Sequence, residues 1–470
     1  MKKKNVVCFG SCDMYPTYGF VGGMREYGSK VISFGESNND IFSQLYHLIR
    51  KENQQVINKA DLIVVGIGGV FKENVDFYIS LYKLFYEKLW NLQKKILVVI
   101  MPHAETIDGA YGWFHHHQCE YYGFNVIDIK SFLKQRKLDE FYMNYYDWQH
   151  PFYSFMSGIS KRVLKNYDKL CVPKKNINSL YENIELEILS IKEMVQGDFD
   201  FKKVRTFTQY EDVCKFKVGE KIKIPVKYCG FSMIGIHSFN GVFSKGYQGL
   251  SLLCNNKGNF AIVQLPNNYV TPILYDFVID NESYLLNSDN KKFQLLPSEH
   301  QYNGVCELGL VAFVFAKNID VIIKNNDFYN KEVNISSQYN FSYLLEFLEE
   351  GKKFIEDYNK KQNQEDYKYY ELGRALMVNS HSFFEYIKLP LVMLSVNIMR
   401  KQSIKIKNTI FKDMFLVYKF KEKELKYNIR YIIELGRAYT KYKKFYYFGW
   451  RWVKLYFKSK KLRKKYDKQN

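Results

Sequence analysis

Asn5-Val-Val-Cys-Phe9 is the first of five short segments that decide the fold of this chain. Each segment is five or six residues long, rich in β-branched side chains and largely apolar on both faces, as buried parallel strands are. The other four are Lys30-Val-Ile-Ser-Phe34, Asp61-Leu-Ile-Val-Val65, Ile96-Leu-Val-Val-Ile-Met101 and Asn125-Val-Ile-Asp-Ile129. Helix-period segments lie between them, such as Asp40 to Arg50 and Val75 to Leu92. The alternation predicts an α/β fold with a doubly wound parallel sheet in residues 1–170.

Polar side chains that can carry nucleophilic chemistry follow the first and the last of these segments. Ser11 follows the first in Gly-Ser-Cys-Asp, and Asp147-Trp-Gln-His150-Pro follows the fifth, before a predicted helix over 152–164. Ligands of a doubly wound sheet bind at the carboxyl ends of its strands, so both loops are expected at one edge. A serine nucleophile needs an imidazole that takes its proton and a carboxylate that orients the imidazole. The pattern predicts Ser11 as nucleophile, His150 as base and Asp147 as orienting acid.

These residues and their neighbours also have other interpretations. Ser11 alone could cap a helix, since serine is a favoured N-cap residue. Cys12 is a rival nucleophile, although a small buried residue is its simpler role. His115-His116-His117 suggests a metal site, but consecutive histidines on a helix point in different directions, so no metal is predicted. His103 follows the fourth segment and is a weak candidate for substrate contact.

With Gly10-Ser11 and Asp147-x-x-His150-Pro151 at these places, residues 5–168 resemble the SGNH (GDSL-like) hydrolase family. The resemblance implies a flavodoxin-like five-stranded sheet with the catalytic serine after its first strand and the acid and base late in the domain. It also implies that Gly35, after the second segment, is an oxyanion glycine.

The family's third motif, Gly-x-Asn-Asp, is matched in part. Gly68 is a weak match to its glycine, whereas Val70 stands where the family has the asparagine that completes the oxyanion hole. Asn74, four residues further on, is a weak candidate to replace it. Because the loss of one oxyanion donor costs about 10² to 10³ in rate, the departure permits a slow enzyme or a catalytically degenerate domain.

The hydrophobic pattern of the chain changes after residue 170. A helical, charged linker is predicted over 171–206. Residues 207–330 follow a period of two, as in Lys221-Ile-Lys-Ile-Pro-Val-Lys-Tyr228, with recurring turn signals. This pattern predicts an antiparallel, sandwich-like β domain, for which glycan binding is one possible role.

Residues 331–470 are predicted to form a helical, basic C-terminal region. Glu-Leu-Gly-Arg-Ala occurs at 371–375 and again at 434–438, which indicates a duplicated helical module. The chain has a net charge of +20, and 441–470 alone hold twelve Lys or Arg and one acid, interleaved with aromatic residues. Such a segment suits the acidic face of a membrane. RNA is disfavoured because no nucleic-acid module accompanies it, and a helix packed on the chain's own β domain is the structural alternative.

Composition and cysteine usage bound the class and the compartment. With 47% hydrophobic and 25% charged residues the chain is not disordered throughout. Eight scattered cysteines without a CxxC pair favour a reduced, cytoplasmic chain. The apolar run after Met1-Lys-Lys-Lys4 is too short for a signal peptide, and no run approaches the 20 or so apolar residues that span a bilayer. The prediction is a cytoplasmic protein, peripheral at the inner membrane.

The repeated segments resemble the helical tails of bacterial enzymes that assemble capsule and lipooligosaccharide, whose tails end in a stretch like Tyr386-Ile-Lys388. Together the two resemblances imply a serine esterase or O-acetyltransferase that acts on acyl esters of a surface polysaccharide or its glycolipid precursor. No cofactor is predicted, and a transferase would need an acyl donor such as acetyl-CoA. The alternative is a catalytically degenerate SGNH domain that serves as a glycan-binding or scaffold protein.

Overall fold

The computed structural model describes most of the chain up to residue 352. The described residues are 3–15, 19–35, 40–68, 75–102, 110–138, 153–179, 181–195, 199–206, 210–243, 248–254, 260–266, 269–273, 277–287, 307–318 and 333–352. The repeated helical module and the basic segment 441–470 therefore lie outside the described residues. Within the described part, no helix is both long enough and apolar enough to cross a membrane.

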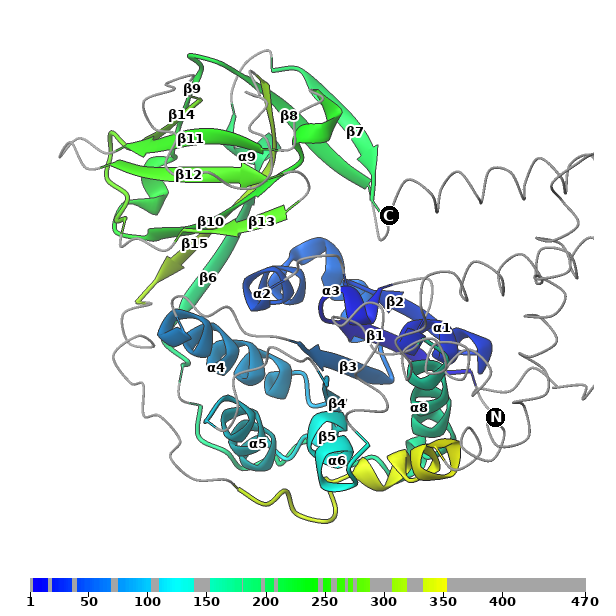
Figure 1. The fold of residues 1–470 in the computed structure, drawn as a ribbon. Coiled ribbons are helices and arrows are strands. Elements are labelled where there is room, and N and C mark those ends of the chain that lie inside the picture. The colour runs from blue at the N-terminus through cyan, green and yellow to red at the C-terminus, as the bar shows by residue number, and fades with distance from the viewer. Residues whose placement is uncertain are drawn as a thin grey trace, which may run out of the picture. The chain divides into compact units, whose positions relative to one another are not determined.

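The five predicted segments are the strands of one parallel sheet, so the α/β prediction is confirmed. The strands lie in the order β2-β1-β3-β4-β5, which is a doubly wound order (Figure 1). Their bounds are Asn5–Phe9 (β1), Lys30–Ser33 (β2), Leu62–Ile67 (β3), Lys95–Ile100 (β4) and Asn125–Asp128 (β5).

Helices alternate with these strands, and those predicted over 40–50, 75–92 and 152–164 are present as α2, α4 and α8. Asp40 explains the start of α2, because its Oδ1 accepts a hydrogen bond from Ser43 N at 2.9 Å, as an N-cap does. The bounds are Gly19–Glu26 (α1), Ile41–Ile49 (α2), Lys51–Asn58 (α3), Val75–Asn91 (α4), Ala110–Tyr122 (α5), Ile129–Gln135 (α6) and Tyr153–Lys165 (α8).

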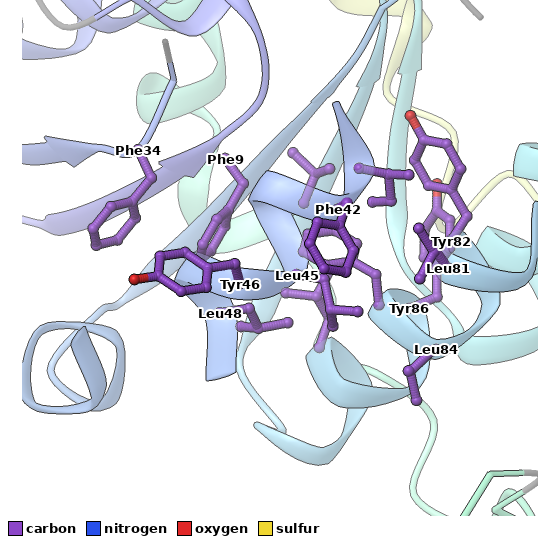
Figure 2. Packing of buried hydrophobic residues seen from close by; sticks show 14 of the residues in the cluster. Phe9, Phe34, Phe42, Leu45, Tyr46, Leu48, Leu81, Tyr82, Leu84 and Tyr86 are labelled. Atoms are coloured by element: carbon purple, nitrogen blue, oxygen red, sulfur yellow. The ribbon is translucent and has the colours of Figure 1, made fainter. Parts of the chain in front are cut away.

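A buried aromatic cluster joins α2 and α4 to the sheet. Figure 2 shows three of its aromatic members, Phe9 at the end of β1, Phe34 just after β2 and Tyr46 of α2. The rings of Phe9 and Phe34 stack at 5.4 Å, and Phe9 meets Phe85 of α4 edge-on at 5.8 Å. All of these side chains are at most 2% exposed, so the carboxyl half of the sheet packs against a fully buried aromatic layer.

The β-rich region forms two antiparallel sheets, as the period of two predicts. One sheet has the order β13-β10-β15-β8-β7, with β6 paired to β15, and the other has the order β12-β11-β14-β9. Buried residues of both sheets, such as Phe216, Ile222 and Leu285, belong to one hydrophobic cluster. The bounds are Glu185–Ser190 (β6), Phe201–Arg205 (β7), Tyr210–Lys217 (β8), Lys221–Lys223 (β9), Ser232–Ser238 (β10), Gln248–Cys254 (β11), Phe260–Pro266 (β12), Tyr269–Pro272 (β13), Tyr284–Asn287 (β14) and Glu307–Lys317 (β15).

The structure differs from the predicted helical linker over 171–206. That range contains the strands β6 and β7, and its one described helix is the single turn Ile191–Met194 (α9). Glu185-Leu-Glu-Ile-Leu-Ser190 is rich in good helix formers, yet it pairs with β15 from Lys317 to Ala312. Tertiary pairing overrides local helix propensity here, because β6 pairs with β15, a strand that lies far along the chain.

The chain returns to the parallel sheet after β15, so the α/β layer does not end at residue 170. Val126 of β5 donates to the Tyr339 carbonyl and accepts from Phe341 N, both at 2.8 Å. Asn340 forms a parallel bridge with Val126, and Asp128 N donates to Ser342 Oγ at 3.0 Å. The returning segment thereby pairs with the outer edge of β5. Without this segment, the backbone groups at that edge would be open to pairing with another chain.

Helix α2 also packs on the β-rich region along one face. Gly235 of β10 makes room for this contact, because a Cβ at that position would overlap the Phe42 ring. Tyr46 Oη and His237 Nδ1 are hydrogen-bonded at 3.0 Å. At the end of α2, both guanidinium nitrogens of Arg50 bind the Glu211 carboxylate, at 2.6 and 2.7 Å. Contacts along its whole length therefore fix α2 to the β-rich region.

The Asp40 cap predicts an unusual pH dependence of stability. Burial raises the pKa of Asp40 to about 6, although hydrogen bonds from Ser43 and Tyr269 favour its ionised form. The unfolded-state pKa is about 3.9, so folding becomes less favourable as the pH rises from about 4 to 6, by up to about 3 kcal/mol from this group. In urea unfolding, Asp40→Asn is expected to gain about 2–3 kcal/mol on the wild type between pH 4 and pH 7, because asparagine also caps helices.

Asp128→Asn is the matched control for this measurement. The net shift of the Asp128 pKa is downward, so the pH-dependent part of its contribution to stability lies below about pH 4, and its variant should differ from the wild type by a nearly constant amount between pH 4 and pH 7. Equal slopes for the two variants would contradict the assignment of the Asp40 pKa.

Candidate active site

Ser11 follows β1 at the point of the sheet where the strand order reverses, between β1 and β3. It precedes the short 3₁₀ helix Cys12–Met14 (η1) in the N-cap position, and its carbonyl accepts from Met14 N at 3.0 Å. Its hydroxyl makes no capping hydrogen bond, so helix capping does not account for this serine. Ser11 is half-buried, which leaves part of it open to a ligand.

Met14 fixes the loop that carries Ser11. Its side chain is fully buried among three glycines, Gly10, Gly35 and Gly66, which lie at or near the ends of β1, β2 and β3. A Cβ would lie 2.7 Å from Met14 Cγ if placed on Gly10, 2.5 Å from Met14 O on Gly35 and 2.9 Å from Met14 Cε on Gly66. Side chains at these positions would displace Met14, so the glycines form a cradle that positions η1.

Ser33 connects this loop to the loop after β2. Its hydroxyl is buried; it donates to the Met14 carbonyl and accepts from Gly35 N, the latter at 3.1 Å. The Gly35 amide is therefore close to the Ser11 loop, as the oxyanion prediction requires. The same amide already has an acceptor in Ser33 Oγ.

Three of the predicted site residues lie in the described structure, at the carboxyl ends of three neighbouring strands. Ser11 follows β1, Gly35 follows β2, and the half-buried Gly68 follows β3. The remaining predicted residues, Asp147, His150, Asn74 and His103, lie outside the described residues, as does Val70.

Contacts near both ends of α8 fix the direction in which this helix runs along the sheet. Just after α8, the Tyr167 carbonyl accepts from Lys95 Nζ at 3.0 Å, and the Tyr167 hydroxyl donates to the Asp61 carbonyl at 3.2 Å. Lys95 and Asp61 mark the amino ends of β4 and β3. Ser157, in the N-terminal half of α8, packs on Gly23 of α1. Helix α8 therefore runs from the carboxyl side of the sheet toward its amino side.

Cys12 is poorly suited to be the nucleophile. Burial and the neighbouring Asp13 carboxylate raise the pKa of its thiol, against a weaker opposing hydrogen bond to Ser11. Its Sγ lies 3.8 Å from Ser11 Oγ. Since the thiolate is the reactive form of cysteine, a raised pKa keeps Cys12 in its unreactive thiol form at neutral pH.

A buried histidine–carboxylate pair at the end of β5 was not anticipated as such from the sequence. His116 Nε2 lies 2.8 Å from Asp128 Oδ2, and Ser131 donates to the same carboxylate through N and Oγ, at 2.8 and 2.7 Å. Burial raises the pKa of Asp128, but these hydrogen bonds outweigh it and the net shift is downward. The available signal was Asp-x-x-Ser131 after a strand, which is a helix-capping pattern.

The His116–Asp128 pair cannot serve Ser11 directly. β5 is three strands away from β1, which is about 14 Å at the usual spacing of neighbouring strands. The pair instead fastens α5 and the start of α6 to the end of β5. Among the described residues, no group of three or more His, Cys, Asp or Glu could hold a metal ion.

Gly35→Ala is expected to disturb this site through Met14. The new methyl group would lie 2.5 Å from the Met14 carbonyl oxygen, so backbone must move, at a cost of about 1–3 kcal/mol in the free energy of unfolding. Gly112→Ala is the control, because nothing lies within 4 Å of a Cβ there and α5 should gain about 0.5–1 kcal/mol. Chemical unfolding measures both; equal effects would contradict the glycine cradle.

No protein-family model matches the chain, and no curated protein matches it.

Proposed function

We propose that this chain is a serine esterase or O-acyltransferase of SGNH-like, flavodoxin-like design. Its substrates are acyl esters, such as acetyl esters, of a bacterial surface polysaccharide or its precursor. The observation that carries the proposal is the position of Ser11. Its hydroxyl is spared from helix capping, at the carboxyl edge where the strand order reverses, beside the loops of Gly35 and Gly68. Ligands of doubly wound sheets bind at this place.

The proposed catalytic group consists of Ser11, His150 and Asp147. Ser11 Oγ attacks the acyl carbonyl while His150 accepts its proton, and His150 then protonates the leaving group, an alkoxide from a sugar ester or a thiolate from a thioester donor, which leaves an acyl-enzyme. Asp147 orients His150. Water completes hydrolysis, or a sugar hydroxyl completes transfer, with the acyl group arriving from a donor such as acetyl-CoA.

The oxyanion would be held by backbone N–H groups of Ser11 and Gly35, with weaker candidates in Gly68 and Asn74. Preorganised donors of this kind contribute about 10² to 10³ each in rate. In the same proposal, segment 441–470 holds the protein at the inner face of an acidic membrane, and the β-rich region contacts the glycan.

A specific contact favours the second candidate function, a catalytically degenerate domain that binds glycan or acts as a scaffold. The Gly35 amide already donates to Ser33 Oγ, so an oxyanion would share this N–H in a three-centre hydrogen bond, which makes it a weaker oxyanion donor. The absence of the family asparagine at Val70 points the same way.

Labelling with a fluorophosphonate probe separates the two functions, because only an activated serine reacts with it. Intact, folded protein is expected to be labelled at Ser11, as located by peptide mass spectrometry, and heat-unfolded protein is expected to remain unlabelled. Folded protein that is not labelled would overturn the enzymatic proposal in favour of the binding protein. Label on another residue would remove Ser11 from the role of nucleophile.

A further inference from the structure

We infer that Ser33 is the positioning residue that sets the distance between Ser11 and Gly35, the two backbone contributors to the proposed oxyanion hole. The inference rests on the proposed function and adds to it a residue that no sequence motif marks. Ser33 is the last residue of β2 and is 2% exposed. It has no access to a substrate, so it acts through its neighbours.

The observation is a continuous chain of hydrogen bonds between the two loops. Met14 N donates to the Ser11 carbonyl at 3.0 Å, and the Met14 carbonyl accepts from Ser33 Oγ. Ser33 Oγ in turn accepts from Gly35 N at 3.1 Å. Ser33 Oγ is therefore the one side-chain group in this path, and every other group in the path belongs to the backbone.

A hydroxyl is suited to this place because it donates and accepts at once. Its proton satisfies the buried Met14 carbonyl, and its oxygen receives the Gly35 amide. An alanine would leave both backbone groups without this partner, and the loops of β1 and β2 could move apart. A misplacement of about 1 Å at reacting groups can cost about 10²-fold in rate.

The glycine cradle around Met14 and the hydrogen bonds of Ser33 constrain the Ser11 loop in different ways. Gly35 approaches the Met14 carbonyl so closely that a Cβ has no room, and Gly10 contacts the Met14 side chain in the same way. Packing therefore holds Met14 laterally, whereas the Ser33 hydrogen bonds tie the Gly35 amide to the loop that carries Ser11. Ser33 thus sets the separation of the two loops more than the burial of either loop.

The test compares fluorophosphonate labelling of Ser11 in the wild type and in Ser33→Ala, Ser33→Thr and Ser33→Cys. The second-order labelling rate is expected to fall about 10- to 100-fold in Ser33→Ala. It should fall less in Ser33→Cys, which keeps the volume but is a weak donor, and recover in Ser33→Thr, which keeps the hydroxyl. With p-nitrophenyl acetate, kcat should fall with KM within about twofold, because the lost interaction forms in the transition state.

Ser160→Ala is the matched control. Ser160 is a fully buried serine whose hydroxyl donates to the Ser157 carbonyl at 3.0 Å, within α8. Its removal should lower the unfolding midpoint about as much as Ser33→Ala does, without slowing the labelling of Ser11.

The outcomes separate this inference from the proposed function. A wild type that is not labelled at Ser11 refutes the proposed function. A labelled wild type with Ser33→Ala labelled within twofold of it, or faster, refutes the positioning role of Ser33 alone. If Ser33→Ala does not fold, Ser33→Cys and Ser33→Thr decide: equal labelling rates in these two variants would refute the inference.

Discussion

Ser11→Ala is expected to abolish fluorophosphonate labelling and to lower the turnover of p-nitrophenyl acetate by about 10⁴-fold or more, while the protein stays folded. Loss of a serine nucleophile removes the covalent step, and known cases lose up to about 10⁶ in kcat. Stability should change little, because the Ser11 hydroxyl caps no helix and the residue is half-buried. Thermal unfolding of the variant, within about 2 °C of the wild type, establishes that the loss is chemical.

Cys12→Ser is the matched control for the same assay. The Cys12 thiol has a raised pKa and lies next to the nucleophile, so its replacement changes the neighbourhood of Ser11 without removing the reacting oxygen. This variant should keep turnover within about tenfold of the wild type. A protein that loses activity with Cys12→Ser and keeps it with Ser11→Ala would reverse the assignment of the nucleophile.

Breaking the Arg50–Glu211 pair is expected to have the largest effect on stability, about 3–5 kcal/mol for Arg50→Met or Glu211→Leu alone. The side chains are 7% and 3% exposed, and two hydrogen bonds of 2.6 and 2.7 Å join them. Removal of one partner leaves a charge in the buried contact of α2 with β8, where water cannot replace the lost partner. Arg50 keeps a second contact with Glu52, but that carboxylate is 54% exposed and compensates little.

The double variant Arg50→Met, Glu211→Leu is expected to recover most of the loss, because two apolar side chains of similar size leave no charge unpaired. Glu26→Gln is the exposed control: Glu26 pairs with Lys161, is 64% exposed, and should cost less than about 1 kcal/mol. Urea unfolding measures all four variants. If the double variant lost as much stability as the two single variants together, the two side chains would not act as one coupled pair.

Much of the fold followed from local patterns in the sequence. The strands β1 to β5 are short, β-branched and apolar on both faces, and α2 begins at a recognisable aspartate cap, so their existence and type were predictable. β6 was not, because Glu185-Leu-Glu-Ile-Leu-Ser190 has the composition of a helix and becomes a strand only by pairing with β15.

The candidate site divides in the same way. The positions of Ser11 and Gly35 were predictable because each residue follows a strand that the hydrophobic pattern predicts. Ser33 and Met14 carry no sequence signal, since serine and methionine occur in any strand or loop. They are distinguished only by the tertiary structure, in which the glycines at the ends of three strands lie against Met14. His116 was considered for metal as part of a triple histidine, whereas its contact with Asp128 depends on how α5 packs on β5.

The sequence by itself therefore determined the alternation of strands and helices in residues 1–170 and placed Ser11 at a carboxyl edge, because hydrophobic period and strand–helix alternation are properties of neighbouring residues. Only the tertiary structure decided the contacts that hold the site. Arg50 and Glu211 are 161 positions apart, and Tyr46 and His237 are 191 apart. No local pattern specifies such pairs, since they form when packing of buried surfaces brings distant segments within hydrogen-bonding distance.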